Sequence, residues 1–247
     1  MSNKSIVITG ASDGIGKALS WVMAARGYNL GLTARRIELL EKLKDEIQKE
    51  YPSIIVCVQV MDVTDYEQQE AVLAALHQQL GKIDILVVNA GIAIAGKTGL
   101  MPLSDQLAVI NTNLNGAIAT VASGLKIFRQ QGHGHLVATS SIAAFRGLSR
   151  NAAYCASKSG FTTFMEAVRV ETYKENIDVT VLHPGYIDTE INRGLASRPF
   201  VIGVEKGASI YANLIERKVA SSTVPKFPWN MVGPLLKVLP TSLIAKM

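Results

Sequence analysis

The sequence Ser5-Ile-Val-Ile-Thr9-Gly10-Ala-Ser12-Asp13-Gly14-Ile15-Gly16 joins a short apolar run to a turn that contains three glycines. The apolar, β-branched run predicts a buried strand over 5–9, and helical spacing of apolar residues predicts a helix over 17–26. A glycine-rich turn between a strand and a helix is typical of phosphate binding, because the backbone can approach a pyrophosphate and the first helical N–H groups are free. The glycine spacing differs from GxGxxG, so a merely tight turn remains an alternative.

A second motif overlaps this turn. The residues from Gly10 to Gly14 also match the G-x-S-x-G nucleophile elbow of hydrolases, which would make Ser12 a nucleophile. That fold needs a strand and an oxyanion-hole loop upstream of the elbow, and only nine residues precede Gly10. The sequence therefore favours phosphate binding over hydrolysis.

Strands and helices alternate along the rest of the chain. Apolar runs predict further strands over 28–33, 54–60, 83–88, 136–141 and 179–182. Helical patterns occupy 37–49, 64–80, 102–129, 152–173 and 205–217, and a capping box is expected from Thr64 to Glu67. This alternation predicts an α/β fold with a Rossmann-like, doubly wound parallel sheet of about seven strands and helices on both faces. We expect one domain over 1–247, with an atypical apolar, proline-rich tail at 219–247.

Composition narrows the possible functions. The chain has 247 residues, of which 48% are hydrophobic and 18% charged, and its formal net charge is +5. Lys and Arg form no run of five or more, so a nucleic-acid partner is not expected. Cys57 and Cys155 form no CxxC motif, and the four histidines lack metal-ligand spacing, so no metal is expected. No signal peptide and no apolar stretch of transmembrane length is visible, which leads us to expect a cytoplasmic protein.

The end of the second predicted strand indicates the cofactor. In dinucleotide-binding folds an acidic residue at this place binds the 2′-hydroxyl of NAD, whereas arginine accommodates the 2′-phosphate of NADP. This sequence has Arg35 and Arg36 there, and no Asp or Glu occurs from Tyr28 to Ile37. We therefore expect NADP(H) rather than NAD(H), unless Asp13 weakens that preference or the two arginines are simply solvated.

Tyr154 and Lys158 stand four residues apart in a predicted helix, so their side chains share one face. At about 4 Å and an effective dielectric constant near 20, an ammonium stabilises a phenolate by about 4 kcal/mol. That interaction would lower the tyrosine pKa from about 10 toward about 7. The pair is then a candidate proton donor, although an isolated pair of this kind is often only a surface contact.

These motifs together resemble the short-chain dehydrogenase/reductase family, in its shorter single-domain form, from about Lys4 to Lys218. The resemblance implies a cofactor site formed by the glycine-rich turn, the two arginines, an acidic segment, an Asn-Ala-Gly segment, the Tyr-Lys pair and a Pro-Gly segment. The residues at these places are Gly10, Ser12, Asp13, Gly14, Ile15, Gly16, Arg35, Arg36, Asp62, Val63, Asn89, Ala90, Gly91, Tyr154, Lys158, Pro184, Gly185, Ile187 and Thr189.

The resemblance also implies the catalytic residues Asn113, Ser141, Tyr154 and Lys158. Ser141 is chosen over Ser140 because it precedes the tyrosine by thirteen residues, and Asn113 because it stands three before Gly116. The implied reaction is hydride transfer between the nicotinamide and a carbonyl or alcohol. Tyr154 would supply the proton, Ser141 would hold the substrate oxygen, Lys158 would lower the tyrosine pKa and bind the ribose, and Asn113 would anchor a relay water.

Apolar residues predict the substrate class. Ala93, Ile94, Ala95, Phe145 and Leu148 are expected to line the pocket, with a short lid at 192–200, which favours an apolar ketone, aldehyde or acyl compound. A nucleotide-sugar epimerase or dehydratase and a non-catalytic dinucleotide sensor or scaffold are the alternatives.

The tail departs from many members of this family. It carries Trp229 among several prolines and leucines, so it could pack on the core, cover the substrate or contact a membrane surface. The resemblance also implies a homodimer or homotetramer formed through the long helices at 102–129 and 152–173, although burial in the core explains the apolar residues of these helices equally well.

Overall fold

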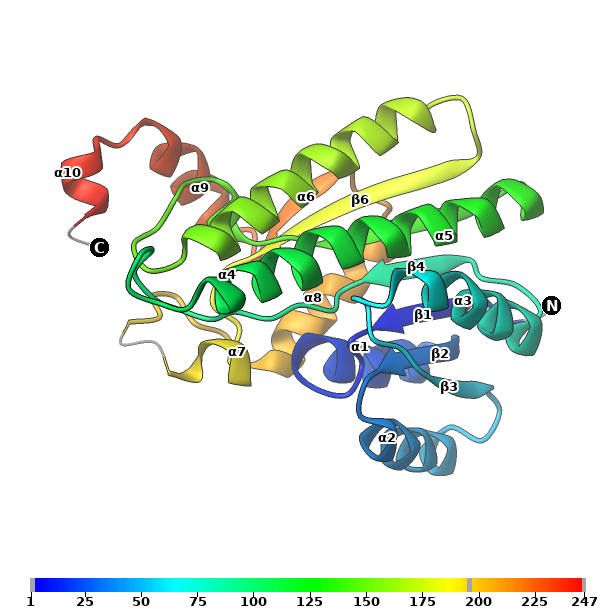
Figure 1. Ribbon diagram of the computed structural model, residues 1–247. Coiled ribbons are helices and arrows are strands. Elements are labelled where there is room, and N and C mark those ends of the chain that lie inside the picture. Colours follow the sequence, from blue (N-terminus) through cyan, green and yellow to red (C-terminus); the bar gives the residue numbers. More distant parts are fainter. Residues whose placement is uncertain (1–2, 195–196, 246–247) are drawn as a thin grey trace.

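The computed structural model describes residues 3–194 and 197–245, and in it a parallel sheet lies between two layers of helices (Figure 1). The seven strands follow the order β3-β2-β1-β4-β5-β6-β7, and every neighbouring pair is parallel. Their bounds are β1 Ser5–Thr9, β2 Asn29–Ala34, β3 Val56–Val60, β4 Ile85–Val88, β5 Gly134–Thr139, β6 Ile177–Pro184 and β7 Ser221–Val224. The predicted doubly wound sheet is confirmed.

Helices cover both faces of the sheet. On one face lie α1 (Gly14–Ala25), α2 (Ile37–Glu50) and α8 (Val204–Glu216), and on the other lie α3 (Tyr66–Leu80), α5 (Ala117–Gln131) and α6 (Ala152–Glu171). Strand β1 shows why its residues are all apolar or small. Ile6 and Ile8 join the first hydrophobic cluster, whereas Val7 joins the second, so a strand buried on both faces reads as a continuous apolar run.

The strand order creates a crevice beside β1. Strands β2 and β3 extend from β1 in one direction, while β4 pairs with its other edge. The chain segments that leave the carboxyl ends of β1 and β4 therefore diverge, and such a switch point is where open α/β sheets bind their ligands.

The predicted long helix is continuous but irregular. It comprises α4 (Leu103–Ile110), a π-helical segment η1 (Asn111–Gly116) and α5. The π-helical segment was not predicted, and Gly116 occupies it because a Cβ there would lie 2.4 Å from the Val63 carbonyl oxygen. Single π-helical turns inside α-helices are frequent at functional sites.

Two helix starts differ from the sequence prediction. Helix α1 begins at Gly14, three residues earlier than expected, because the Asp13 carboxylate accepts the Gly14 N–H at 2.7 Å and caps the helix. The predicted capping box at Thr64 is wrong. Asp65 caps α3 by accepting the Gln68 N–H, whereas the Thr64 hydroxyl donates to the Asp62 carboxylate at 2.8 Å.

The seventh strand falls inside the segment predicted to be a tail. Strand β7 pairs with β6 from Val181 opposite Ser221 to Pro184 opposite Val224. Its short, serine-rich sequence has no strand pattern, and only the edge of β6 specifies it. The tail proper contains α9 (Trp229–Val238) and α10 (Thr241–Ile244), while η2 (Ile142–Ala144) and α7 (Glu190–Arg193) complete the described elements. Among the described residues, no helix is long and apolar enough to cross a membrane.

Candidate active site

A cavity of about 570 Å³ opens at the carboxyl ends of the central strands. Its walls come from the glycine-rich turn, the segments after β2, β3, β4 and β5, helix α6, and the segment after β6. All predicted cofactor residues line it except Gly16, and so do three of the four predicted catalytic residues. The lining residues that were predicted are Gly10, Ser12, Asp13, Gly14, Ile15, Arg35, Arg36, Asp62, Val63, Asn89, Ala90, Gly91, Ser141, Tyr154, Lys158, Pro184, Gly185, Ile187 and Thr189.

The glycine-rich turn is packed so tightly that side chains are excluded. Gly10 has φ +67°, and a Cβ there would lie 2.8 Å from the Ala90 Cα. Gly16 lies behind the cavity wall, where a Cβ would approach the Gly10 carbonyl oxygen to 2.4 Å. Gly10 and Gly16 therefore set the close packing of the turn, and the start of α1 faces the cavity with its free N–H groups.

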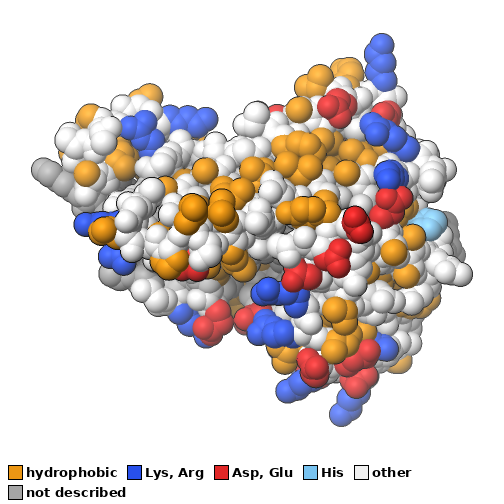
Figure 2. Space-filling view, in the orientation of Figure 1, with side chains coloured by type: hydrophobic (Ala, Val, Ile, Leu, Met, Phe, Trp, Pro, Cys, Tyr) orange, Lys and Arg blue, Asp and Glu red, His pale blue; other side chains and the backbone are white. Residues whose placement is uncertain are grey.

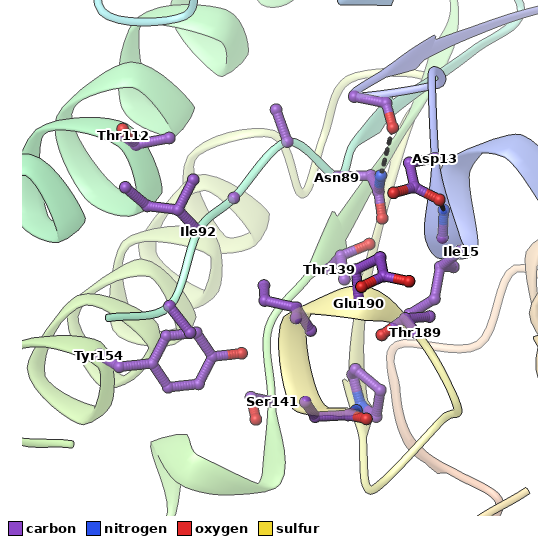
Figure 3. Close-up of a pocket in the computed structure, with 18 of the residues that line it drawn as sticks. Asp13, Ile15, Asn89, Ile92, Thr112, Thr139, Ser141, Tyr154, Thr189 and Glu190 are labelled. Carbon is purple, nitrogen blue, oxygen red and sulfur yellow. Dashed lines mark hydrogen bonds between the residues drawn. The ribbon is translucent and has the colours of Figure 1, made fainter. Parts of the chain in front are cut away.

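Asn89 fastens the segment after β4 to the turn after β1. Its side-chain amide donates to the Thr9 carbonyl at 3.0 Å and to the Gly10 carbonyl at 3.4 Å (the latter dashed in Figure 3), and its backbone N–H donates to the Thr9 hydroxyl at 2.9 Å. The Asn89 side chain thus bonds the local backbone. These bonds hold together the two segments that border the switch point.

Positive charge lies beside the glycine-rich turn. Arg36 donates to the Ser12 hydroxyl at 3.1 Å and lies 4.0 Å from the Asp13 carboxylate. Both members of this ion pair are more than half exposed, so the pair is weak. Burial opposes ionisation of Asp62, but hydrogen bonds from Thr64 and the charge of Arg35 hold the Asp62 pKa below its usual range.

The residues present fit a phosphorylated dinucleotide. The cavity combines a helix N-terminus, an arginine within reach of Ser12, and the Asp62 carboxylate near the far wall. The Asp13 carboxylate caps α1 and lies 4.0 Å from the Arg36 guanidinium. Among residues 3–194 and 197–245, no cluster of His, Cys, Asp and Glu has the geometry of a metal site.

Three side chains converge at the β5–α6 end of the cavity. Tyr154 projects from the first turn of α6, and Ser141 follows β5 on the facing wall, so that the phenol and the hydroxyl point into the same space (Figure 3). Lys158 is buried one turn later, and its Nζ lies 5.9 Å from the Tyr154 ring centroid. The choice of Ser141 over Ser140 fits this geometry, because the Ser140 hydroxyl donates instead to the Lys158 carbonyl at 3.2 Å.

The protonation states differ from the sequence prediction. Burial in the cavity wall raises the Tyr154 pKa, although its hydrogen bond with Ser141 acts in the opposite direction. Burial lowers the Lys158 pKa to about 8, and Nζ donates to the Thr139 carbonyl at 2.8 Å. The predicted fall of the Tyr154 pKa is wrong, because desolvation by burial outweighs the interactions that lower this pKa.

Asn113 lies behind the cavity in the π-helical segment. Its Oδ1 accepts the Ile92 N–H and its Nδ2 donates to the Ile92 carbonyl, both at 2.8 Å. A Cβ on Gly91 would lie 3.1 Å from Asn113 Oδ1 and 3.5 Å from Lys158 Nζ. Asn113 thus holds the segment that separates it from the cavity, and lies on the same side as the Lys158 ammonium.

The substrate end was predicted only in part. Ala93, Ala95 and Leu148 line the cavity, whereas Ile94 and Phe145 do not. Phe145 packs against His183, with ring centroids 4.9 Å apart. The segment expected to form a lid includes Leu195 and Ala196, which lie outside the described residues. Its far end is fixed by pairing of Ile187 with Ile202 and by an ion pair between Arg198 and Asp188 at 2.6 Å.

Several lining residues carry no sequence signal of their own. Ile92, Thr139, Asn151, Tyr186, Glu190, Ile191 and Asn192 reach the cavity because the fold brings their segments there. Trp229 does not line the cavity, and of the roles considered for the tail it packs on the core. Its indole packs where a Gly185 Cβ would be, at 2.1 Å from Nε1, so the tail supports the Pro184–Gly185 wall from behind. The only available signal was the Pro-Gly pair itself.

Comparisons with known proteins agree with this geometry. A sequence model of short chain dehydrogenases matches residues 4–199. An uncharacterized oxidoreductase of Mycobacterium tuberculosis (strain ATCC 25618 / H37Rv) is 38% identical over 244 residues, which cover 98% of this chain and 96% of the relative. An NADP-dependent 3-hydroxy acid dehydrogenase of Schizosaccharomyces pombe is 31% identical, covering 78% of this chain and 74% of that protein.

The fold has a solved counterpart with a bound cofactor analogue. The alcohol dehydrogenase of the archaeon Thermococcus sibiricus, complexed with 5-hydroxy-NADP, superposes with a TM-score of 0.82 at 26% identity, covering 89% of this chain and 95% of that chain. The family match covers more than half of the sequence, and the Mycobacterium tuberculosis relative covers 98% of it. The chain therefore belongs to the short chain dehydrogenase family of oxidoreductases.

Proposed function

We propose that this protein is an NADP(H)-dependent oxidoreductase that interconverts an apolar carbonyl compound and its alcohol. The observation that carries the proposal is one continuous cavity with Arg36 and the glycine-rich turn at one end and Tyr154, Ser141 and Lys158 at the other. When bound, the nicotinamide supplies or accepts the hydride. The chain's own residues bind the reactants, orient the carbonyl and move the proton.

Tyr154 is the proposed proton donor in the reducing direction. Its raised pKa keeps the phenol protonated at neutral pH, which is the form that a general acid requires. Ser141 faces the same space and is placed to donate a hydrogen bond to the substrate oxygen. Lys158 carries its positive charge below a pH of about 8 and favours the phenolate that remains after proton transfer.

Asn113 is proposed to support proton transfer indirectly. Its amide is bonded at both ends to Ile92, and its Oδ1 lies near the Lys158 ammonium across Gly91. It therefore fixes the cavity wall beside Lys158. The relay water implied by the family resemblance stays a prediction.

NADP(H) is proposed over NAD(H) because Arg36 stands beside Ser12 at the edge of the glycine-rich turn. Arginine forms short, charge-assisted hydrogen bonds with phosphate. The bound 5-hydroxy-NADP of the archaeal structure and the NADP dependence of the yeast relative support the same choice.

The substrate end supports an apolar carbonyl compound. Aliphatic side chains form much of its wall, namely Ile92, Ala93, Ala95, Leu148 and Ile191. Polar side chains, among them Asn151, Tyr186, Glu190 and Asn192, also line the cavity. We also propose a cytoplasmic enzyme that assembles into a homodimer or homotetramer through the long helices.

The direct test measures oxidation of NADPH and of NADH with a panel of ketones, aldehydes and acyl thioesters. We expect turnover with an apolar carbonyl compound and a preference for NADPH. Replacing Arg36→Ala should raise the KM for NADPH about tenfold, the size of one lost charged hydrogen bond, and should change the KM for NADH little. Tight NADPH binding without any turnover would favour the sensor, and an NADH preference would contradict the cofactor assignment.

A further inference from the structure

The outer face of α9 and α10 is apolar and exposed. Met231, Leu235 and Val238 are 65%, 52% and 77% exposed, and they follow one another at intervals of four and three residues. Such spacing places them in one stripe along the helix. Phe227 and Leu243 extend the stripe at either end, with 71% and 48% of their surface exposed. We call these five residues the outer stripe.

The inner face of the same helices is fixed to the body of the protein. Trp229, Gly233 and Leu236 of α9 and Ile244 of α10 are buried. Arg146 donates to the Lys237 and Leu239 carbonyls at 3.4 and 3.3 Å, which holds the carboxyl end of α9. Because the opposite side of the helix is committed to the core, the outer stripe cannot turn inward without breaking these contacts.

The charged side chains near the C-terminus are all basic. The last 31 residues, 217–247, contain five Lys and Arg and no Asp or Glu, although Arg217 and Lys218 precede β7 and Lys218 pairs with Asp178 at 2.6 Å. Lys226 and Lys237 are exposed, and within the described part of the chain neither forms an ion pair, while the Lys237 ammonium lies 5.6 Å from the Phe145 ring centroid. Lys246 lies outside the described residues.

The region also projects from the molecule. Helices α9 and α10 extend beyond the carboxyl end of the sheet, on the side away from the N-terminus (Figure 1). On the face drawn in Figure 2, the same projection carries hydrophobic and basic side chains but no acidic ones. Helix α9 has 10 residues, about half of what a membrane span requires, so it would have to lie along a surface.

The basic charge and the apolar surface of the α9–α10 face together indicate the kind of partner that it binds. A two-fold contact between copies through this face would bring the same lysines against one another. An anionic lipid surface instead offers hydrocarbon to the outer stripe and phosphate to the lysines. We propose that the α9–α10 face docks the protein on an anionic lipid bilayer, with the outer stripe inserted at the level of the headgroups.

The test is co-sedimentation of the full chain with extruded vesicles. We expect binding to vesicles of equal parts phosphatidylglycerol and phosphatidylcholine, weaker binding to phosphatidylcholine alone, and release at about 0.5 M NaCl, where screening is strong. The double variant Leu235→Glu/Val238→Glu should bind at least about tenfold more weakly, because it loses apolar area and gains charges that the lipid repels.

The matched control is Leu100→Glu/Leu103→Glu. It changes two leucines at the same spacing that are 81% and 67% exposed, far from α9 in the sequence, and it should bind vesicles like the unmodified protein. Unchanged thermal denaturation midpoints confirm that both variants are folded. The proposal is overturned if the unmodified protein stays in solution with anionic vesicles, or if both double variants bind equally. It is also overturned if the α9 variant changes only the oligomeric state in analytical ultracentrifugation, since the face would then be a contact between copies.

Discussion

The two ends of the cavity differ in the kinds of chemical groups that form them. The dinucleotide end consists of backbone and small residues, where Gly10 and Gly16 leave no room for a Cβ and Thr9 is bonded to Asn89. The proton-transfer end consists of large side chains, with Tyr154 and Lys158 projecting from α6. The first end depends on steric fit and the second on desolvation. A substitution at the first should therefore change binding, and one at the second should change protonation.

Replacing Tyr154→Phe should have the largest effect and should confine it to the proton-transfer end. Loss of a general acid typically costs 10² to 10⁴ in rate, and we expect a fall in kcat of about a thousandfold. NADPH affinity, measured by fluorescence titration, should stay within about twofold, because the ring remains in place. Tyr186→Phe is the control, since it removes another phenol from the cavity wall and should leave kcat nearly unchanged. Comparable rates for Tyr154→Phe and the unmodified enzyme would remove Tyr154 from the mechanism.

Replacing Gly10→Ala should disturb the opposite end. The new Cβ meets the Ala90 Cα at 2.8 Å in a left-handed backbone conformation, and overpacking of this kind costs about 1–3 kcal/mol. We expect NADPH affinity to fall by about ten- to a hundredfold, while the pH dependence of turnover at saturating cofactor keeps its shape.

The Gly27→Ala variant tests whether steric collision or backbone strain causes the loss of affinity expected for Gly10→Ala. Gly27 has φ +79°, but its Cβ would have no heavy atom within 4 Å. Its variant should lose some stability without losing NADPH affinity. Equal losses of affinity in both variants would show that strain, and not the contact with Ala90, governs the turn.

The pH dependence of Lys158 tests whether desolvation governs the proton-transfer end. Burial lowers its pKa from 10.5 to about 8, so kcat/KM for carbonyl reduction should fall about tenfold per pH unit above that value as the ammonium is lost. The free energy of unfolding should change with pH in the direction opposite to kcat/KM. Between pH 8 and 10.5 the unfolded chain binds more protons at this lysine than the folded chain, so the free energy of unfolding should rise with pH.

The control for this prediction is Lys158→Met, which removes the titrating group. Urea unfolding of the cofactor-free protein at several pH values should then show no rise attributable to this position. A rise of the same size in both proteins would mean that another group titrates in that range.

The same contrast explains how much of the molecule was predictable. The cofactor end was visible in the sequence because glycine, asparagine and arginine at fixed spacing describe steric and charge requirements that are local. The direction of the Tyr154 pKa shift was not visible, since it depends on burial by segments distant in the sequence. Strand β7 was missed for a related reason, because Ser221 and Ser222 become strand residues only beside β6.

The smallest effect is expected for a substitution at Trp229. This residue packs the tail against the Pro184–Gly185 wall of the cavity. Its ring makes edge contacts with Tyr186 and Phe200 at centroid distances of 5.9 and 5.7 Å, and its Nε1 has no hydrogen-bond partner among the described residues. Trp229→Phe keeps an aromatic ring and removes an unsatisfied donor, so the loss of volume and the relief of the polar penalty should nearly cancel. We expect a change in the free energy of unfolding within about 1 kcal/mol from urea titration, whereas Trp229→Ala should cost about 3–5 kcal/mol. If the phenylalanine variant were as unstable as the alanine variant, the indole N–H would have to be satisfied in solution, and the packing against Gly185 would not be what holds α9 in place.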